Sequence, residues 1–410
     1  MSSLNLWFAK IRVATVFALL TFVSAAQLSA QTERTIFEFN GTTQGSSPEA
    51  GLIADSSGAL YGTTPWGGLT ESGYWGGTVF KLTLSSAGNS EWKEDLLYKF
   101  QGGNLNNDGA NPYCTLVFDN AGHLYGTTEH GGQNGWGTVF QLVPPAAPGG
   151  AWTENIIYSG FNGSYFAGLV IDSNGNLYGA AFNGEVFQLV PPAAPGGTWT
   201  YNVLAEVGNY MTSSLITDNK GNLYGTTQQT GHYNAGLVFG LIRPTTAGDP
   251  WTQVDIYSFK SGSDGWTPVS GLTLKSGVFY GTTLHGGVYN EGTVYSVTPP
   301  AAPGSPWRED VLYSFVGSGD DGSAPEGGVV FGNGGDLYGA TSAGGGSYNL
   351  GMVYKLTPPA APGDPWTETN VHSFTGRGHD GGKPLDTLLL LHGAFFGTGA
   401  SPSTVFEVSQ

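Results

Sequence analysis

Three histidines in glycine-rich segments are the residues of this chain best suited to proton transfer. His130 and His285 each precede two glycines, and His379 precedes Asp380. Imidazole titrates near neutral pH, and a neighbouring carboxylate such as Glu129 or Asp380 can orient it as a general acid or base. No spacing links the three histidines, so an active site requires the fold to gather two or three such groups around one pocket. Without that convergence, each is a solvated turn residue.

Linear motifs of several enzyme classes are missing from the sequence. It contains no Gly-x-Ser-x-Gly, no His-Glu-x-x-His and no Walker loop. The single cysteine, Cys114, lies in an apolar stretch and has no local base. We therefore predict a non-enzymatic binding or scaffold module. The alternative is a lyase or hydrolase that acts on an extracellular polysaccharide or small molecule through loop His, Asp and Tyr residues.

Carboxylates in glycine-containing turns raise the question of a bound cation. Calcium takes six to eight oxygen ligands, and the densest local group of acids is Asp320, Asp321 and Glu326. No Asp-x-Asp-x-Asp-Gly loop occurs, and turn formation alone accounts for the dipeptide Asp-Gly. We predict no cofactor, with calcium held by these acids as the alternative. Asp-Gly occurs before four of the repeats described below, at Asp108, Asp264, Asp321 and Asp380.

Seven copies of a short motif divide the chain into similar units. The motif is Tyr-Gly-Thr-Thr in its first copy and recurs at intervals of 46 to 64 residues. An apolar run and a turn precede each copy, and a glycine-rich loop and two further strand-like segments follow it. Each unit therefore predicts four short antiparallel strands. The copies begin at Tyr61, Tyr125, Tyr178, Tyr224, Tyr280, Tyr338 and Phe396.

The two ends of the chain carry complementary parts of one unit. The last unit stops after its third strand at Val408, whereas residues 34–39 resemble a fourth strand placed before the first unit. Pairing of residues 36–39 with residues 404–408 would complete a seventh sheet and protect its edges. We predict an all-β, seven-bladed β-propeller with four antiparallel strands per blade, closed by the N-terminal strand. An open β-solenoid is the rival architecture.

The repeat resembles that of a known bacterial family. Leu-Tyr-Gly-Thr-Thr, a Gly-Gly loop and Gly-Thr-Val-Phe-Lys-Leu are similar to the GloVer tandem repeat, over nearly all of residues 31–410. The order Gly-Leu-Val-x-Asp, Gly-Asn-Leu-Tyr also resembles NHL-type propellers. The resemblance implies an exported protein, often with a C-terminal anchoring segment. This chain departs from that pattern, because it ends at its last predicted strand.

Residues that differ between the units are the better candidates for a ligand site, because invariant ones are explained by the geometry of a blade. Strand alternation places the glycine-rich loops and the blade-to-blade crossings on one face. Units three and four depart most from the pattern on that face, and aromatic rings beside Asn side chains suit neutral sugars. Looser packing of degenerate repeats is the alternative. The predicted floor of the binding site is formed by Tyr165, Phe166, Phe182 and Tyr210.

The first thirty residues have the features of a secretory signal peptide. Lys10 and Arg12 precede the apolar run 13–23, and small residues follow, so cleavage after Ala26 or after Ala30 is expected. A retained signal anchor is the alternative. We therefore expect a secreted, extracellular or periplasmic protein with no membrane span in the mature chain, in which residues 31–410 form a single domain.

Composition restricts the partners of the mature chain. The formal net charge is −17, and only 11% of residues are charged, whereas 13% are aromatic. Nucleic-acid binding depends on basic patches, so it is not expected. We predict a monomer whose partner is an extracellular polysaccharide or a protein of the cell envelope.

Overall fold

The computed structural model describes residues 33–69, 75–85, 91–102, 108–161, 167–194, 196–246, 248–302, 304–361 and 363–409. The predicted signal peptide, residues 1–30, lies outside these ranges. Residues 31–410 form one compact unit. Within the described ranges there is no α-helix, only two short 3₁₀ turns, η1 (Gly262–Asp264) and η2 (Asn333–Gly335). No helix there is long and apolar enough to cross a membrane.

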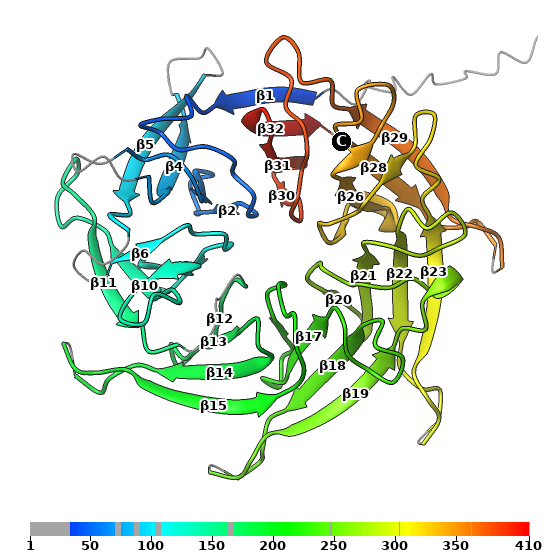
Figure 1. Ribbon diagram of the computed structural model, residues 1–410, viewed down its shortest axis with the longest axis horizontal. Helices are drawn as coiled ribbons and strands as arrows, with labels where there is room; N and C mark the ends of the chain where they lie inside the picture. The colour runs from blue at the N-terminus through cyan, green and yellow to red at the C-terminus, as the bar shows by residue number, and fades with distance from the viewer. Residues whose placement is uncertain are drawn as a thin grey trace, which may run out of the picture. The chain divides into compact units, whose positions relative to one another are not determined.

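Seven four-stranded antiparallel sheets are arranged in a ring (Figure 1), and residues of several blades line a central channel. This confirms the predicted seven-bladed β-propeller. In each blade the innermost strand faces the channel and the fourth strand lies on the outside (Figure 1). The innermost strands have only two or three residues, because space narrows toward the axis of the ring.

Within each of the first six blades, the strands follow one another in chain order from the channel outward. Blades one to three consist of β2 (Ile53–Ala54), β3 (Leu60–Thr64), β4 (Thr78–Leu84) and β5 (Trp92–Lys99); β7 (Val117–Phe118), β8 (Leu124–Thr127), β10 (Val139–Val143) and β11 (Thr153–Tyr158); and β12 (Val170–Ile171), β13 (Leu177–Ala180), β14 (Glu185–Val190) and β15 (Thr200–Glu206).

Blades four to six consist of β16 (Ile216–Thr217), β17 (Leu223–Thr227), β18 (Leu237–Ile242) and β19 (Thr252–Ser258); β20 (Thr273–Lys275), β21 (Val278–Thr283), β22 (Thr293–Thr298) and β23 (Arg308–Ser314); and β25 (Val330–Phe331), β26 (Leu337–Thr341), β28 (Met352–Thr357) and β29 (Thr367–Ser373). Blade seven consists of β30 (Leu389–Leu391), β31 (Ala394–Ala400), β32 (Ser403–Ser409) and β1 (Glu33–Glu38).

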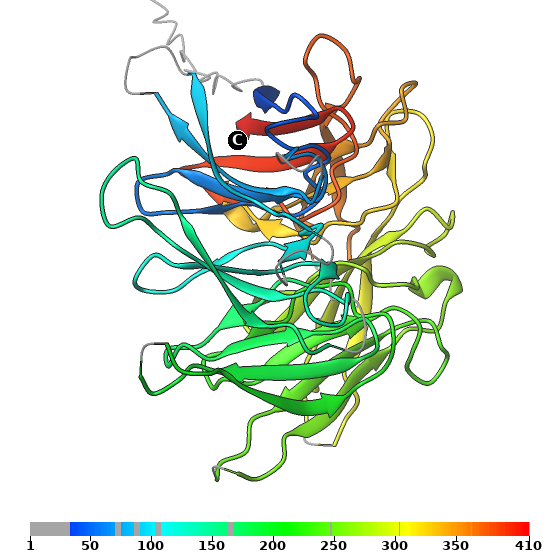
Figure 2. The ribbon, with the colours of Figure 1, turned by 60° about the vertical axis from the view of Figure 1, so that its left-hand side comes forward.

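The N-terminal strand closes the ring as predicted. Strand β1 pairs antiparallel with β32, with Glu33 opposite Val408 and Glu38 opposite Thr404. Figures 1 and 2 show the blue β1 beside the red β32. Just after the strand, Phe39 is buried and packs edge-on against Phe80 of the first blade. The closing strand therefore joins the last blade by backbone pairing and the first blade by aromatic packing.

A glycine in the second strand of every blade makes room for an aromatic ring of the third strand. A Cβ built on Gly179 would lie 2.4 Å from Cζ of Phe187, far inside contact distance. This explains the Gly of the Tyr-Gly-Thr-Thr repeat, because only glycine permits so close an approach. The seven rings that face these glycines are Phe80, Phe140, Phe187, Phe239, Tyr295, Tyr354 and Phe406.

The turn between the first and second strands is closed by an aspartate in an Asx-type arrangement. Asp55 Oδ1 accepts hydrogen bonds from the backbone N–H groups of Ser57 and Ala59, and its Oδ2 accepts one from the hydroxyl of Tyr61 at 2.9 Å. Burial acts to raise the pKa of Asp55, but these hydrogen bonds outweigh it, so the pKa is lowered. The repeated tyrosine thus hydrogen-bonds to the turn through its hydroxyl, in addition to packing its ring in the core. The same arrangement recurs at Asp119, Asp172 and Asp218.

The crossings between blades pair with the loops between second and third strands, which confirms that the two share a face. Two small ladders make this pairing, β6 (Gly109–Ala110) with β9 (His130–Gly131) and β24 (Gly322–Ser323) with β27 (Ala343–Gly344). Isolated bridges do the same between Ser46 and Trp66 and between Trp266 and His285. We call this surface the loop face.

Candidate functional site at the loop face

In six of the seven crossings, the residue four positions before the first residue of the innermost strand lines the opening of the central channel. In blades one, two, five, six and seven this residue directly follows a proline. The channel has a cavity volume of about 520 Å³. We call these residues the mouth ring; its third-blade counterpart, Phe166, lies outside the described residues. The described members are Glu49, Tyr113, Thr212, Val269, Glu326 and Leu385.

The mouth ring was not predicted from the sequence, although a signal for it was present. The residue after proline varies between Glu, Tyr, Val and Leu in otherwise similar crossings. Such variation at one position of a repeat marks the place where blades differ in chemistry while sharing a backbone. Because six blades each contribute one described side chain, the ring combines carboxyl, phenol, hydroxyl and apolar groups around one opening.

The carboxyl groups at the mouth keep protons at higher pH than free carboxyls. Burial, followed by the charges of Glu326 and Glu129, raises the pKa of Glu49 to about 7. Burial also raises the pKa of Glu326, against the opposing effects of a hydrogen bond from Ser342 at 2.6 Å and the charge of Lys383. A carboxyl that is half protonated at neutral pH can both donate and accept hydrogen bonds. The mouth therefore suits a ligand rich in hydroxyl groups.

A second cavity of about 510 Å³ extends from the mouth over blades six and seven. It shares Glu49 and Glu326 with the channel, and Asn349 and Lys383 also line it. Deeper in the channel, Asp386 accepts hydrogen bonds from the backbone N–H of Gly51 at 2.6 Å and from the hydroxyl of Thr115 at 3.0 Å. The polar groups thus form a continuous surface from the channel wall to the loops.

Exposed aromatic rings surround the mouth on the same face. Among the described residues, every aromatic side chain that is largely exposed lies in a loop between a second and a third strand. Their exposed fractions range from 43% to 56%. The guanidinium of Arg377 lies over the ring of Tyr348, 4.7 Å from its centroid. We call these rings the aromatic rim: Trp66, Trp75, Trp136, Tyr233, Tyr289 and Tyr348.

Two of the four residues predicted as a ligand-binding floor are in contact. The rings of Phe182 and Tyr210 meet edge-to-face, with centroids 4.7 Å apart, and the N–H of Tyr210 donates to the carbonyl of Phe182 at 2.7 Å. Both side chains are half-buried. The other two, Tyr165 and Phe166, lie outside the described residues. The loop that joins β13 to β14 is very short, so blade three has no long loop that could cover Phe182 and Tyr210.

The backbone position of Tyr210 follows from the geometry of the ring. Its φ of 63° is in the left-handed region, which non-glycine residues seldom adopt. Its carbonyl accepts a hydrogen bond from the N–H of Gln228 in the next loop. The equivalent residue in the other described crossings also has a positive φ, although its side chain differs from crossing to crossing. The equivalent residues are Ser47, Asn111, Thr267, Ala324 and Lys383.

The three histidines proposed for proton transfer lie in separate parts of the loop face. His130 is exposed, with Nδ1 3.5 Å from a carboxylate oxygen of Glu129. His285 packs against Trp266, and Nδ1 of His379 lies within hydrogen-bonding distance of a carboxylate oxygen of Glu38, at 2.6 Å. Among the described residues, no hydrogen bond or ion pair joins any two of these histidines. The enzymatic alternative remains a prediction.

The acids proposed for calcium are directed to different places. Asp321 accepts hydrogen bonds from the backbone N–H groups of Val316 and Gly322 and from the hydroxyl of Tyr313. Glu326 belongs to the mouth ring, and Asp320 is exposed. The four Asp-Gly aspartates lie at separate blade interfaces and do not meet at the channel. Each aspartate lies between the outer strand of the preceding blade and the outer strand of the following blade.

These aspartates belong to a repeated cluster of a tyrosine, an aspartate and a glutamate, which was not predicted from the sequence. The hydroxyl of Tyr98 on β5 donates toward Asp108 of the crossing, at 3.3 Å, and toward Glu154 on β11 of the next blade, at 2.9 Å. We call this arrangement an interblade triad. Two further triads place a tyrosine, an aspartate and a glutamate in the same way: Tyr257, Asp264 and Glu309; and Tyr313, Asp321 and Glu368.

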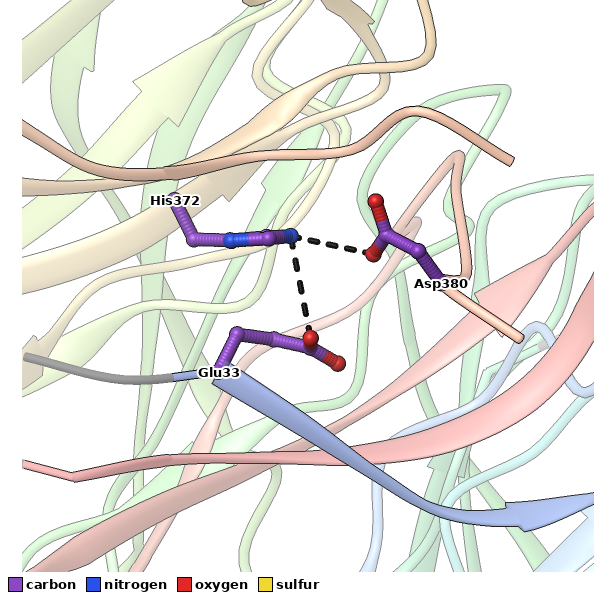
Figure 3. Close-up of side chains that lie close together, drawn as sticks. All are labelled: Glu33, His372 and Asp380. Atoms are coloured by element: carbon purple, nitrogen blue, oxygen red, sulfur yellow. Dashed lines mark hydrogen bonds and ion pairs between the residues drawn. The ribbon is translucent and has the colours of Figure 1, made fainter. Parts of the chain in front are cut away.

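The fourth interblade triad differs from the others in one residue. On β29, His372 takes the place of the tyrosine, and its Nε2 lies 3.0 Å from Asp380 and 3.8 Å from Glu33 (Figure 3). Glu33 belongs to the closing strand β1, so this triad joins the two ends of the ring. Asp380, a proposed catalytic residue, is therefore held at the ring closure and not at the channel.

Comparisons with known proteins agree with this architecture. A family model described as the Gloeobacter/Verrucomicrobia repeat matches residues 21–239 and 180–404. No curated protein matches the chain. The β-propeller domain of Cps50 (Swd1) from Myceliophteria thermophila is similar in structure, with a TM-score of 0.53, 11% identity, and coverage of 92% of this chain and 100% of that chain. A Trichoderma reesei Carbohydrate-Active Enzymes Family AA12 structure has a TM-score of 0.47 and 12% identity, covering 93% and 96%. At these identities the likeness extends to the fold alone.

Proposed function

The chain belongs to the Gloeobacter/Verrucomicrobia repeat family, and on this premise we propose that it is an exported, non-enzymatic binding module for extracellular carbohydrate. Export is supported by the features of residues 1–30. The main support for carbohydrate binding is the aromatic rim. Exposed apolar groups that gather on one face of a protein mark an interaction site.

Sugar rings present apolar faces of C–H groups that stack on aromatic side chains. The rim offers such rings on blades one, two, four, five and six, at the height of the loops. Blade three, whose loop carries Phe182, has the shortest loop, and the loops of the neighbouring blades two and four carry the exposed rings of Trp136 and Tyr233. We place the main sugar-binding surface there, between the two exposed rings.

Hydroxyl groups of a sugar need both donors and acceptors. Glu49 has a pKa of about 7, so near neutral pH it presents both a carboxyl O–H and carboxylate oxygens. The side-chain amide of Gln228 donates to the hydroxyl of Thr212 at 2.7 Å and also lines the channel. A neutral or weakly charged polysaccharide fits these groups better than a polyanion, given the formal net charge of −17.

The test is binding of the purified mature protein to an array of extracellular polysaccharides. The informative variant is Trp136→Ala combined with Tyr233→Ala, because both side chains are about half exposed and their loss leaves no cavity in the core. Leu84→Ala is the matched control, since Leu84 is also half exposed but lies at the far end of β4, away from the loop face.

We expect selective binding by the wild type and the Leu84 variant, and a loss of at least about tenfold in affinity for the double variant. Absence of binding to every polysaccharide would overturn the carbohydrate proposal and favour docking of an envelope protein. Turnover of a bound polysaccharide, detected as new reducing ends, would favour the enzymatic alternative.

A further inference from the structure

The triad at the ring closure is the one place among the described residues where three groups that can bind a metal ion converge. One oxygen of Glu33, Nε2 of His372 and one oxygen of Asp380 all lie within 4.8 Å of one another. At three other blade interfaces the position of His372 is a tyrosine. Among the four triads of the described residues, the imidazole occurs only in the one that contains a residue of β1.

We propose that Glu33, His372 and Asp380 bind a divalent transition metal ion of the Zn²⁺ type, which fastens the closing strand. Zinc takes nitrogen and oxygen ligands at about 2.0 to 2.2 Å in tetrahedral sites, so its ligand atoms stand about 3.3 Å apart. The separations of 3.0 Å and 3.8 Å from His372 Nε2 to Asp380 and Glu33 lie on either side of that value. Small side-chain adjustments would bring the three atoms around one ion.

The surroundings of the three ligands support a metal site. The side chains of Glu33 and Asp380 are only 8% and 15% exposed, and that of His372 is 23% exposed. The second oxygen of Asp380 accepts hydrogen bonds from both the N–H and the hydroxyl of Thr375, each at 2.7 Å. Such outer-shell hydrogen bonds orient a ligating carboxylate. A metal site with three protein ligands keeps a fourth position for water.

The chemistry of the ligands also selects the class of ion. One imidazole with two carboxylates suits zinc and its neighbours among divalent transition metals. Calcium and magnesium prefer all-oxygen sites with six or more ligands, which three side chains including an imidazole do not supply. The bound ion would neutralise two carboxylates that otherwise stand close together with a single imidazole between them.

A metal at this position would link the first described strand to the sixth blade. Glu33 lies on β1, whereas His372 lies on β29 and Asp380 in the crossing that follows it. The ring is otherwise closed here by the backbone pairing of β1 with β32. An ion that binds the closed ring but not the opened one stabilises the closed form by mass action.

The chain itself provides the matched variant for a test. His372→Tyr recreates the triad present at three other interfaces, so the protein is expected to fold with its ring closed. Chelator-treated mature protein, wild type and variant, is titrated with ZnCl₂ near neutral pH, and thermal unfolding and calorimetric binding are measured. We expect zinc to raise the Tm of the wild type by about 3 °C at saturation and to leave the variant unchanged.

A second variant separates ligation from folding. Glu33→Gln keeps the shape of the side chain but is a much weaker ligand, so it should reduce zinc affinity by at least about tenfold. If zinc does not bind the wild type, His372 only contacts the two carboxyl groups without a metal ion, and the proposal is wrong. Equal zinc binding by the wild type and the His372→Tyr variant would place the ion elsewhere, for example at His130 or His379, and would also overturn it.

Discussion

The hydroxyl of Tyr98 in the first blade donates toward Glu154 of the second blade at a distance of 2.9 Å. The same hydroxyl also faces Asp108, so two carboxyl groups meet one donor at the interface. Burial, followed by the charge of Asp108, raises the pKa of Glu154. A proton retained on one of the carboxyls removes their repulsion. The blades are therefore joined by acidic contacts that depend on protonation, as well as by apolar packing.

Stability should fall as the pH rises from mildly acidic to alkaline. Burial, followed by Asp264, raises the pKa of Glu309 to about 9, whereas an unfolded glutamate has a pKa of about 4.3. The folded state thus holds a proton that the unfolded state releases, so its contribution is complete below about pH 4 and is lost as the pH approaches 9. Urea unfolding at about pH 5.5, 7 and 8.5 should show a decreasing free energy of unfolding.

Glu309→Gln isolates this effect. The amide is neutral at every pH and can donate a hydrogen bond toward Asp264, so the variant should be more stable than the wild type above about pH 8, by about 1 to 2 kcal/mol. Glu206→Gln is the control, because Glu206 is exposed on the outer strand β15. A wild type whose stability is flat from about pH 5.5 to 8.5 would show that the triads do not hold protons.

Replacing the glycine of the repeat should be costly although the change is only one methyl group. In Gly179→Ala the new Cβ would lie 2.4 Å from Phe187 and 2.9 Å from Leu169, both in the core. Overpacking of this kind destabilises by about 1 to 3 kcal/mol. Gly271→Ala is the control, because its nearest neighbour would be an oxygen of Ser214 at 3.7 Å, and its φ is not in the left-handed region.

Thermal and urea unfolding of the two variants provide the comparison. We expect the Gly179 variant to unfold at a lower urea concentration with an unchanged m value, since the unfolded surface stays the same. Equal midpoints for the two variants would mean that the third-strand rings move aside freely, and that the glycine repeats for another reason.

The repeat determined how much of this molecule could be predicted from sequence. Strand order, the number of blades and the closing role of residues 34–39 follow from local periodicity and from complementary ends, so all three were confirmed. Glu33 and His372 meet only through closure of the whole ring, and no local pattern relates them. Most positions of the mouth ring can be recognised in the sequence as the residue after proline. That these side chains meet around one opening depends on the radial arrangement of the blades. The fold was therefore predicted correctly, whereas the residues that meet at the blade interfaces and at the channel mouth were not predicted.

Closure of the ring should depend strongly on one residue beside the closing strand. Phe39 is 6% exposed, and its ring centroid lies 5.0 Å from that of Phe80. Phe39→Ala removes this contact and leaves a cavity between blades seven and one, at a cost of about 3 to 5 kcal/mol. Hydrogen exchange should then show faster exchange in β1 and β32 than in blades three to five. Uniform acceleration in all blades would instead indicate that the ring opens only with global unfolding.

Electrostatic coupling across the channel mouth should be measurable directly. The charges of Glu326 and Glu129 add to burial in raising the pKa of Glu49 to about 7. Removing the charge in Glu326→Gln should lower the pKa of Glu49, while burial keeps it above its usual value of 4.5. Carboxyl-carbon NMR of Glu49 during a pH titration, in the wild type and the variant, measures the shift. An unchanged pKa of Glu49 would show that the two carboxyls are screened by water in the mouth, so that each blade presents its group to a ligand independently.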